Sequence, residues 1–461
     1  MTIYDQVKDA LPVNLYDFQV DTVNELGPLK TAGYYLAVGT GKTLTSIAAC
    51  VHKLRTGQIK TVICVMPPVL LTNWSRTLSS IKGVTHVIYR GSPKERDQIN
   101  LDADFVLVGY QIFKKDFARF ERRFTAADNF AVLCDEAQAI KNPGSDNYKK
   151  VRDLSAGQHL LLLTGTPLSI PLDGYVYCNL VAPGMYRSYH QFCNIHVAER
   201  DFFDKPIKFA NLDLLAENMR VNAKFITQRD ALKDLPEVTY TPIFYDLDPA
   251  HKKLYKQLAE EQLIKFDNGE KLDLTNVTAL IHALSQVPMN AEHFSGGRIK
   301  STGLDLLDEI MDELGDRKLV VFTYYKMTNR SLIKHCSKYN AVALYGEISA
   351  KEKQAALDRF VNDPGCRLIL LQTLSGSAGI DHLQDVCNDM LFLENSYNPI
   401  HFEQGVARVL RSGQTLPVNV RIAIANDTIQ KYIMDVVLNK DDILGVVQRG
   451  SGGLRSAIFG Q

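Results

Sequence analysis

The sequence predicts an α/β protein of two tandem domains, each a parallel β-sheet flanked by helices, with a helical connector between them. Short apolar runs recur in both halves of the 461 residues and are separated by segments of helix length. Runs without polar alternation are typical of strands covered on both faces, as in parallel sheets. The runs are residues 34–38, 61–66, 105–110, 130–134 and 159–163 in the first half, and 318–323, 341–345, 367–371, 390–393 and 418–425 in the second.

Helical patterns and loops dominate between the two sets of runs, from about residue 175 to 300. We therefore expect a first domain over residues 1–180, a helical connector or protrusion over 181–298, and a second domain over 299–461. Helices are expected within the connector over residues 212–221 and 250–266.

The composition excludes several classes of protein. Lys+Arg and Asp+Glu both number 52, so no global charge indicates a nucleic-acid partner, although a local basic groove is compatible with this balance. The eight cysteines are scattered without a Cys-x-x-Cys pair, which argues against a structural zinc or a disulfide framework and for a reducing compartment. No signal peptide and no apolar segment of about 18 residues is visible, so we expect a cytoplasmic protein without a membrane partner.

An apolar run, two glycines and a Lys-Thr pair follow one another between Tyr34 and Thr45. Glycines let the backbone curl so that successive N–H groups point at one anion, and a following helix adds its positive end. Lys42 would then reach the terminal phosphates of a nucleotide, and the Thr43 hydroxyl would hold Mg²⁺. Leu36 breaks the strict Gly-x4-Gly-Lys-Thr pattern, so an ordinary glycine turn is the alternative. The predicted nucleotide-binding residues here are Val38, Gly39, Thr40, Gly41, Lys42, Thr43 and Leu44.

Two adjacent carboxylates, Asp135 and Glu136, follow the apolar run 130–134. Ligands of α/β sheets bind at the carboxyl ends of the strands, which is where this pair is expected to lie. Asp135 would hold Mg²⁺, and Glu136 would orient and polarise the water that attacks a γ-phosphate. A pair of solvated acids in a loop is the alternative, but the position about ninety residues after Lys42 favours the catalytic interpretation.

Three further stretches carry groups suited to phosphate. Thr164 and Thr166 follow the run 159–163, and their two hydroxyls could sense the phosphate state and pass it to the other domain, although a strand-ending turn is the simpler interpretation. Small and hydroxyl-bearing residues over 373–381 would allow the backbone to approach a phosphate chain closely. A flexible loop between a strand and a helix is the alternative interpretation. Arg408 and Arg411 are three apart, which on a helix puts both guanidinium groups on one face. There they could neutralise charge on a transferred phosphoryl group, or form a solvated basic face.

Taken in this order, the stretches resemble superfamily 2 helicases and translocases, and within them the Swi/Snf-type branch. The matches run from Leu15 to about Gln448: residues 15–19 resemble the Q motif, 65–74 motif Ia with its extension, 108–111 motif Ib, 135–138 motif II, 164–167 motif III and 404–414 motif VI. The resemblance implies two RecA-like domains, with ATP and Mg²⁺ as cofactors in the cleft between them. It implies Lys42, Glu136, Arg408 and Arg411 as catalytic residues and adds Gln19, whose motif contacts adenine, with Gln138, Gly379 and Asp381, to the nucleotide site.

Less common matches carry the assignment to the branch. Residues 228–236, 245–247 and 252–255 look like the connector of the Swi/Snf-type branch, and residues 345–346 and 359–364 like its second-domain signature. Three positions depart from the pattern: Leu36 at the opening of motif I, Gln138 in place of a histidine in motif II, and Leu410 in place of a histidine in motif VI.

The resemblance implies an ATP-dependent DNA helicase or translocase that acts on forked or branched duplex DNA in replication, recombination or repair. The compact chain resembles phage-encoded or bacterial members, which implies a monomer in the (host) cytoplasm with other replication and recombination proteins as partners. An RNA-dependent ATPase or helicase, and a nucleotide-switched nucleic-acid-binding module without processive movement, are the alternatives. The implied DNA contacts are Pro67, Pro68, Asn73, Trp74, Gly109, Tyr110, Gln111, Thr164, Tyr325, Lys326, Thr373, Leu374, Ser375 and Gly376.

Overall fold

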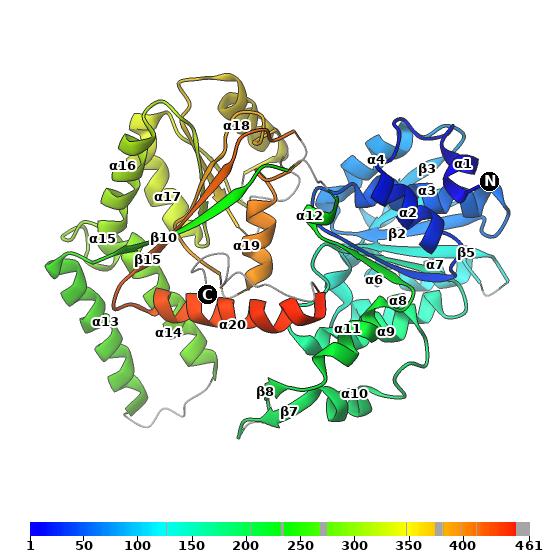
Figure 1. The fold of residues 1–461 in the computed structure, drawn as a ribbon, viewed down its shortest axis with the longest axis horizontal. Helices are drawn as coiled ribbons and strands as arrows, with labels where there is room; N and C mark the ends of the chain where they lie inside the picture. The colour runs from blue at the N-terminus through cyan, green and yellow to red at the C-terminus, as the bar shows by residue number, and fades with distance from the viewer. Residues whose placement is uncertain are drawn as a thin grey trace. The chain divides into compact units, whose positions relative to one another are not determined.

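The computed structural model describes residues 1–125, 127–202, 204–231, 235–267, 274–346, 348–373, 380, 382–396, 398–411 and 413–448. Contacts between residues group the chain into two units, the first over Met1–Lys233 with Ile443–Ser451, and the second over Asp234–Asp442 with the last residues. Each unit is a sheet with helices on both of its faces (Figure 1). The α/β architecture with parallel sheets is therefore confirmed for both units.

The described part of the first unit contains a seven-stranded sheet in the order β3-β4-β2-β5-β6-β1-β9, and its paired strands run parallel. Its strands are β1 (Thr31–Leu36), β2 (Thr61–Met66), β3 (His86–Tyr89), β4 (Phe105–Gly109), β5 (Phe130–Asp135), β6 (His159–Leu163) and β9 (Ala223–Ile226). A separate antiparallel hairpin is formed by β7 (Val197–Arg200) and β8 (Pro206–Phe209). The helices are α1 (Ile3–Val7), α2 (Asp17–Leu26), α3 (Lys42–Arg55), α4 (Leu71–Ser79), α5 (Pro93–Asp97), α6 (Tyr110–Lys115), α7 (Phe117–Arg123), α8 (Asp146–Ser155), α9 (Gly174–Val181), α10 (Tyr189–His196), α11 (Leu212–Arg220) and α12 (Gln228–Ala231).

Helices cover both faces of this sheet, and successive side chains along a strand enter opposite halves of the core. In β2, Val62 and Cys64 pack with residues of α1, α2, α3 and α4, whereas Ile63 and Val65 pack with residues of α6 to α11. Because both faces are buried, the strands read as continuous apolar runs in the sequence.

The second unit repeats this plan with a six-stranded sheet, in the order β10-β15-β14-β11-β13-β12 among the described residues, again with parallel pairs. Its strands are β10 (Val238–Tyr245), β11 (Leu319–Thr323), β12 (Val342–Leu344), β13 (Leu368–Gln372), β14 (Asp389–Phe392) and β15 (Val418–Ala425). Its helices are α13 (Pro249–Asp267), α14 (Leu274–Gln286), α15 (Ala291–Phe294), α16 (Thr302–Leu314), α17 (Lys326–His335), α18 (Ala350–Asn362), α19 (Pro399–Val406) and α20 (Ile429–Gln448). Residues of α18, α19 and α20 fill the core on one face, and residues of α16 and α17 on the other.

All ten predicted strands are confirmed, with bounds that shift by three residues at most. Apart from the β7–β8 hairpin, the described strands absent from the prediction are β3, β9 and β10, and all three lie at sheet edges. An edge strand is covered only in part, so β10 shows partly buried side chains between exposed ones rather than an apolar run. Helices and loops dominate residues 175–300 as expected, but the expectation did not include β9, β10 and the β7–β8 hairpin. Residues 181–298 are shared between the two units, and their role as a separate protrusion stays a prediction.

Candidate nucleotide site

The predicted phosphate loop joins β1 to α3. Gly39 has φ +83° and Gly41 has φ +78°, both in the left-handed region that favours glycine. Gly41 is the N-cap of α3, so Lys42 opens the helix and the loop meets the positive end of the helix. Leu36 ends β1 and is completely buried in the core beneath α3. The departure from the strict pattern therefore falls on a core residue of the strand, and the turn itself keeps its glycines.

Gln19 of α2 braces this loop. Its amide nitrogen donates a hydrogen bond to the carbonyl oxygen of Thr40 at 2.8 Å, and its amide oxygen accepts one from the Tyr16 N–H at 2.9 Å. A Cβ on Gly41 would come within 2.4 Å of the Gln19 amide nitrogen, so a larger residue would displace this brace. The predicted contact between Gln19 and adenine stays a prediction.

The acidic pair lies at the end of β5. Asp135 is 4% exposed, and its carboxylate accepts hydrogen bonds from Trp74 Nε1 at 2.7 Å and from the Glu136 N–H at 2.9 Å. Burial, with repulsion from Glu136, raises the pKa of Asp135 to about 6, against the opposing effects of Lys42 and of the Trp74 bond. Glu136 has φ +51°, which is uncommon for a residue other than glycine. Residues held in such rare backbone conformations are concentrated at functional sites.

Gln138 links the acidic pair to the loop after β6. Its amide nitrogen donates to Glu136 Oε2 at 2.6 Å, and its amide oxygen accepts from Thr164 Oγ1 at 2.8 Å. Thr164 Oγ1 in turn accepts from the Thr166 N–H at 3.1 Å. An amide carries both a donor and an acceptor, as a link between a carboxylate and a hydroxyl requires. The glutamine in motif II thus supplies both hydrogen bonds at this position.

Three loops meet at one edge of the sheet because β5, β6 and β1 are neighbours. In register, Asp135 pairs with Leu163, and Leu163 pairs with Tyr34. A Cβ on Gly165 would come within 3.1 Å of the Val38 nitrogen, so the loop after β6 touches the phosphate loop. The structure therefore brings together the three stretches of the first unit that the sequence singled out separately, at the edge where α/β sheets bind ligands.

The predicted nucleic-acid contacts of the first unit differ in exposure. Pro68, Asn73 and Gln111 are exposed, Pro67 is partly buried and Gly109 is buried. Trp74, Tyr110 and Thr164 are 1%, 5% and 0% exposed, and each donates a hydrogen bond to a residue of the acidic loop. Because burial removes these three side chains from the surface, a contact of these residues with DNA would have to be made through the backbone, and it stays a prediction. A contact through the backbone of Gly109 stays a prediction.

Arg408 and Arg411 follow α19 instead of lying on it. The helix ends at Val406 and turns continue the chain, so the prediction that both guanidinium groups share one helical face is wrong. Arg411 Nη1 donates to the carbonyl oxygen of Ile380 at 3.4 Å. Leu410, between the arginines, is buried in the core of the second unit, where a leucine fits better than the histidine of the family pattern.

The remaining candidates of the second unit lie at the ends of its strands. Tyr325 is partly buried and Lys326 exposed, where α17 begins. The Thr373 hydroxyl donates a hydrogen bond to the carbonyl oxygen of Thr323 at 2.8 Å, and a contact of Thr373 with DNA stays a prediction. Five predicted residues lie outside the described part of the chain: Leu374, Ser375, Gly376, Gly379 and Asp381.

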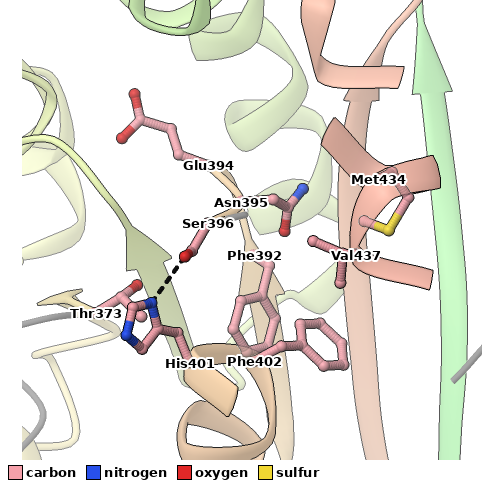
Figure 2. A pocket seen from close by; sticks show the side chains of 9 residues that line it. All are labelled: Thr373, Phe392, Glu394, Asn395, Ser396, His401, Phe402, Met434 and Val437. Carbon is pink, nitrogen blue, oxygen red and sulfur yellow. Dashed lines mark hydrogen bonds between the residues drawn. The ribbon is translucent and has the colours of Figure 1, made fainter. Parts of the chain in front are cut away.

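A small pocket opens beside the end of β14 in the second unit (Figure 2). Its lining consists of Thr373, Phe392, Glu394, Asn395, Ser396, His401, Phe402, Met434 and Val437. Ser396 Oγ and His401 Nδ1 are hydrogen-bonded across it at 2.7 Å. The cavity of about 10 Å³ has room for about one water molecule, which is too small for a nucleotide.

Glu394 is a buried acid that the sequence prediction missed. Its carboxylate, which points away from the aromatic rings of the pocket (Figure 2), accepts hydrogen bonds from the N–H groups of Tyr324 and Tyr325 at 2.9 and 3.0 Å and from Thr328 Oγ1 at 2.5 Å. Burial raises the pKa of Glu394 to about 7. The available signal was its place directly after an apolar run, the pattern that identified Asp135.

We expect Glu394 to make folding pH-dependent. Because its pKa is about 7 when folded and near 4.5 otherwise, its protonation stabilises the fold fully below pH 4.5, and this contribution is lost as the pH rises through 7. The Glu394→Gln variant should flatten the pH dependence of the unfolding free energy in this window by up to about 1.4 kcal/mol per pH unit. Urea unfolding at several pH values measures the pH dependence of the unfolding free energy, and substitution of the exposed Glu309 by glutamine is the matched control. An unchanged slope in Glu394→Gln would contradict the assignment.

Two family models match successive parts of the chain. Residues 37–293 match the SNF2-related domain, and residues 303–413 match the helicase conserved C-terminal domain. The first match alone covers more than half of the 461 residues. The chain belongs to the SNF2-related family. The resemblance found in the sequence is thereby confirmed, and the two units are tandem RecA-like domains.

Two curated relatives match this chain over part of a longer sequence, and one solved structure matches it over nearly its whole length. The chromodomain-helicase-DNA-binding protein 1-like of Mus musculus is 26% identical over 443 residues, covering 90% of this chain and 47% of its own length. The DNA repair and recombination protein RAD54-like of Drosophila persimilis is 25% identical over 473 residues, covering 89% and 59%. The Sulfolobus solfataricus SWI2/SNF2 ATPase core in complex with dsDNA is 23% identical with a TM-score of 0.45, covering 96% and 94%. This SNF2-related chain thus spans about half the length of the curated relatives. Among its described residues, no helix has the length and apolar character to span a membrane.

Proposed function

We propose that this SNF2-related chain is an ATP-dependent DNA translocase or helicase that acts on forked or branched duplex DNA in replication, recombination or repair. The observation that carries the ATPase is the meeting of the phosphate loop, the acidic pair and the Thr164 loop at one edge of a parallel sheet. Lys42 would bind the terminal phosphates of ATP. Glu136, held in place by Gln138, would orient the attacking water and accept its proton.

The donors at this edge fit Mg²⁺. The ion is usually held by one or two carboxylates together with substrate phosphates. Asp135 offers a carboxylate with two hydrogen bonds and further lone pairs to spare, and Thr43 offers a hydroxyl in the first turn of α3. When bound there, Mg²⁺ would offset negative charge on the phosphates.

Arg408 and Arg411 would complete the site from the second unit. Contacts between these arginines and the γ-phosphate would form with ATP and be lost with ADP, so the two nucleotides would favour different arrangements of the units. Repeated ATP binding and hydrolysis would alternate between these arrangements and so move the chain along a nucleic acid that is held by its phosphates.

The arginine assignment predicts that Arg411→Ala lowers DNA-stimulated ATP turnover by roughly 100-fold, the effect of removing one preorganised donor from a transition state. Steady-state ATPase assays with saturating duplex DNA measure this. The exposed Arg298→Ala, also in the second unit, is the control and should behave as the wild type. Intact DNA-stimulated turnover in Arg411→Ala would rule out an arginine finger at this position.

The choice of polymer separates the proposed function from its rivals. ATPase is measured without polymer and with single-stranded DNA, duplex DNA, a four-way junction and RNA, all at one salt concentration because affinity is steeply salt-dependent. The proposal expects the largest rate with branched or duplex DNA. Stimulation by RNA alone would indicate an RNA-dependent enzyme, and a rate unchanged by every polymer would indicate a nucleotide-switched binding module.

The β7–β8 hairpin supports action at forks. At its base, His196 is fully buried and shares a hydrogen bond with Tyr186 Oη at 2.8 Å, which fixes the hairpin to its unit. At its turn, Phe202 is 96% exposed, and Ile207 on β8 is 50% exposed. The hairpin extends beyond α10 and α11 of the same unit (Figure 1). A fixed base with an aromatic tip suits stacking on the last base pair of a duplex where its strands divide.

Phe202→Ala should reduce the number of base pairs opened per ATP hydrolysed on forked DNA about tenfold, because an aromatic ring stacked on a base is worth roughly 1–3 kcal/mol. Strand displacement and phosphate release are followed in the same reaction. The control is Phe244→Ala, which removes a half-exposed aromatic ring from the edge strand β10. Equal coupling in the two variants would exclude the hairpin as a strand-separating element.

A further inference from the structure

Two buried hydrogen bonds from different helices end on Asp135. Trp74 Nε1 donates to the carboxylate oxygen Oδ2 at 2.7 Å, and Tyr110 Oη donates to the backbone carbonyl oxygen at 3.0 Å. Trp74 is 1% exposed and Tyr110 5%, so neither bond competes with solvent. One bond fixes the side chain of Asp135 and the other its main chain.

Both donors come from segments that also reach the surface. Trp74 lies in α4, where the preceding Asn73 is exposed, and Tyr110 opens α6, where the following Gln111 is exposed. The two segments follow the paired strands β2 and β4, and Met66 is in register with Gly109. They also touch, because a Cβ on Gly109 would lie 3.2 Å from Pro68 Cγ. A polymer contacting this surface would therefore press on two helices whose inner faces hold the same acid.

We propose that Trp74 and Tyr110 are positioning residues that couple nucleic-acid contact at residues 67–73 and 111 to the orientation of Asp135. This coupling would raise ATP turnover within the first unit, and it rests on the proposed DNA-dependent ATPase. Contact with DNA shifts α4 and α6, and the two hydrogen bonds carry the shift to the carboxylate.

The bonds are suited to this task by their geometry. The Asp135 carboxylate is held on both oxygens, by Trp74 at Oδ2 and by the Glu136 N–H at Oδ1, so its plane is defined. Hydrogen bonds weaken steeply with angle and distance, so a small movement of α4 alters the hold on Oδ2. Asp135 directly precedes Glu136 in the chain. A change in the orientation of Asp135 therefore also changes the orientation of the catalytic Glu136.

Three buried substitutions test the coupling. Trp74→Phe removes the indole N–H, and Tyr110→Phe removes one hydroxyl. The control Tyr177→Phe removes a hydroxyl that is buried in the same core as Tyr110 and has no hydrogen-bond partner among the described residues. ATPase is measured with and without duplex DNA at varied Mg²⁺ and ATP concentrations. Thermal unfolding confirms that each variant is folded.

We expect the ratio of DNA-stimulated to basal turnover to fall about tenfold in Trp74→Phe and about threefold in Tyr110→Phe, since hydrogen bonds to charged groups exceed those to carbonyl groups. The Mg²⁺ concentration for half-maximal rate should rise in Trp74→Phe, while the KM for ATP changes little in either variant. Tyr177→Phe should match the wild type. Wild-type ratios in both folded test variants would overturn the coupling, as would an equal fall in the control.

Trp74 is the only tryptophan in the sequence, so its fluorescence gives a readout that needs neither ATP nor metal. Duplex DNA should change the emission of Trp74 in the wild type, and Asp135→Asn should change it without DNA. Emission that saturating DNA leaves unaltered would overturn the coupling even where ATPase is stimulated. An ATPase that no DNA stimulates would instead overturn the proposed function itself.

Discussion

Replacement of Glu136 by glutamine is expected to lower ATP turnover by about two to four orders of magnitude, the usual contribution of a positioned general base. Glutamine keeps the shape of the side chain, and its amide oxygen still accepts the hydrogen bond that Gln138 donates at 2.6 Å. The substitution therefore removes the charge that polarises water while the loop keeps its structure. ATP binding should persist, and turnover is measured by phosphate release.

The exposed Glu121→Gln serves as the matched control, because it makes the same chemical change on α7. It should retain wild-type turnover. Normal hydrolysis in Glu136→Gln would mean that a group other than Glu136 acts as the base. That group would not be Asp135, because Trp74 and the Glu136 N–H already hold the Asp135 carboxylate.

Lys42→Ala is expected to lower kcat/KM for ATP by about 10³-fold, because charge-assisted hydrogen bonds to phosphate act in a partly desolvated site. Lys42 lies at the N-terminus of α3, partly buried, and it favours the ionised form of Asp135. Its removal should therefore weaken the affinity for Mg²⁺ together with that for ATP. Calorimetric titration with ATP at several Mg²⁺ concentrations measures both effects.

A loss confined to turnover, with ATP affinity unchanged, would contradict the phosphate-binding role of Lys42. The exposed Lys60→Ala is the control for an altered net charge, and it should bind ATP as the wild type does. Equal unfolding temperatures of the two variants would assign the loss to the missing contact.

The central strands of the two parallel sheets could be predicted because a strand that is buried on both faces appears in the sequence as a continuous apolar run. Strands such as β2 and β6 carry apolar side chains toward both layers of helices, and their bounds were predicted to the residue. Strands at the sheet edges gave no such signal. The segment of β10 is a strand because it pairs with β15, with Val238 opposite Val418. Neither the partner strand nor the register is visible in the local sequence.

The site could be predicted in its residue types but only partly in its roles. Lys42 and Asp135 were recognisable because each has a fixed place in a motif, Lys42 in the loop after β1 and Asp135 at the last position of β5. The burial of Trp74 had a signal in the sequence, because Leu71, Trp74 and Leu78 recur at the spacing of one helical face, but the assignment of Trp74 to the DNA contacts passed over this pattern. The helical placement of Arg408 failed because α19 ends at Val406 and nearby Leu410 packs into the core.

The eight cysteines, all reduced and all buried, give the chain a practical property. Burial raises the pKa of thiols such as Cys50 and Cys134 to about 12, so they present almost no reactive thiolate at neutral pH. A cysteine introduced on the surface would therefore react far faster than these buried thiols. One such residue in each unit would accept a pair of dyes without prior removal of the natural cysteines, and energy transfer between the dyes would follow the two units through a cycle of ATP.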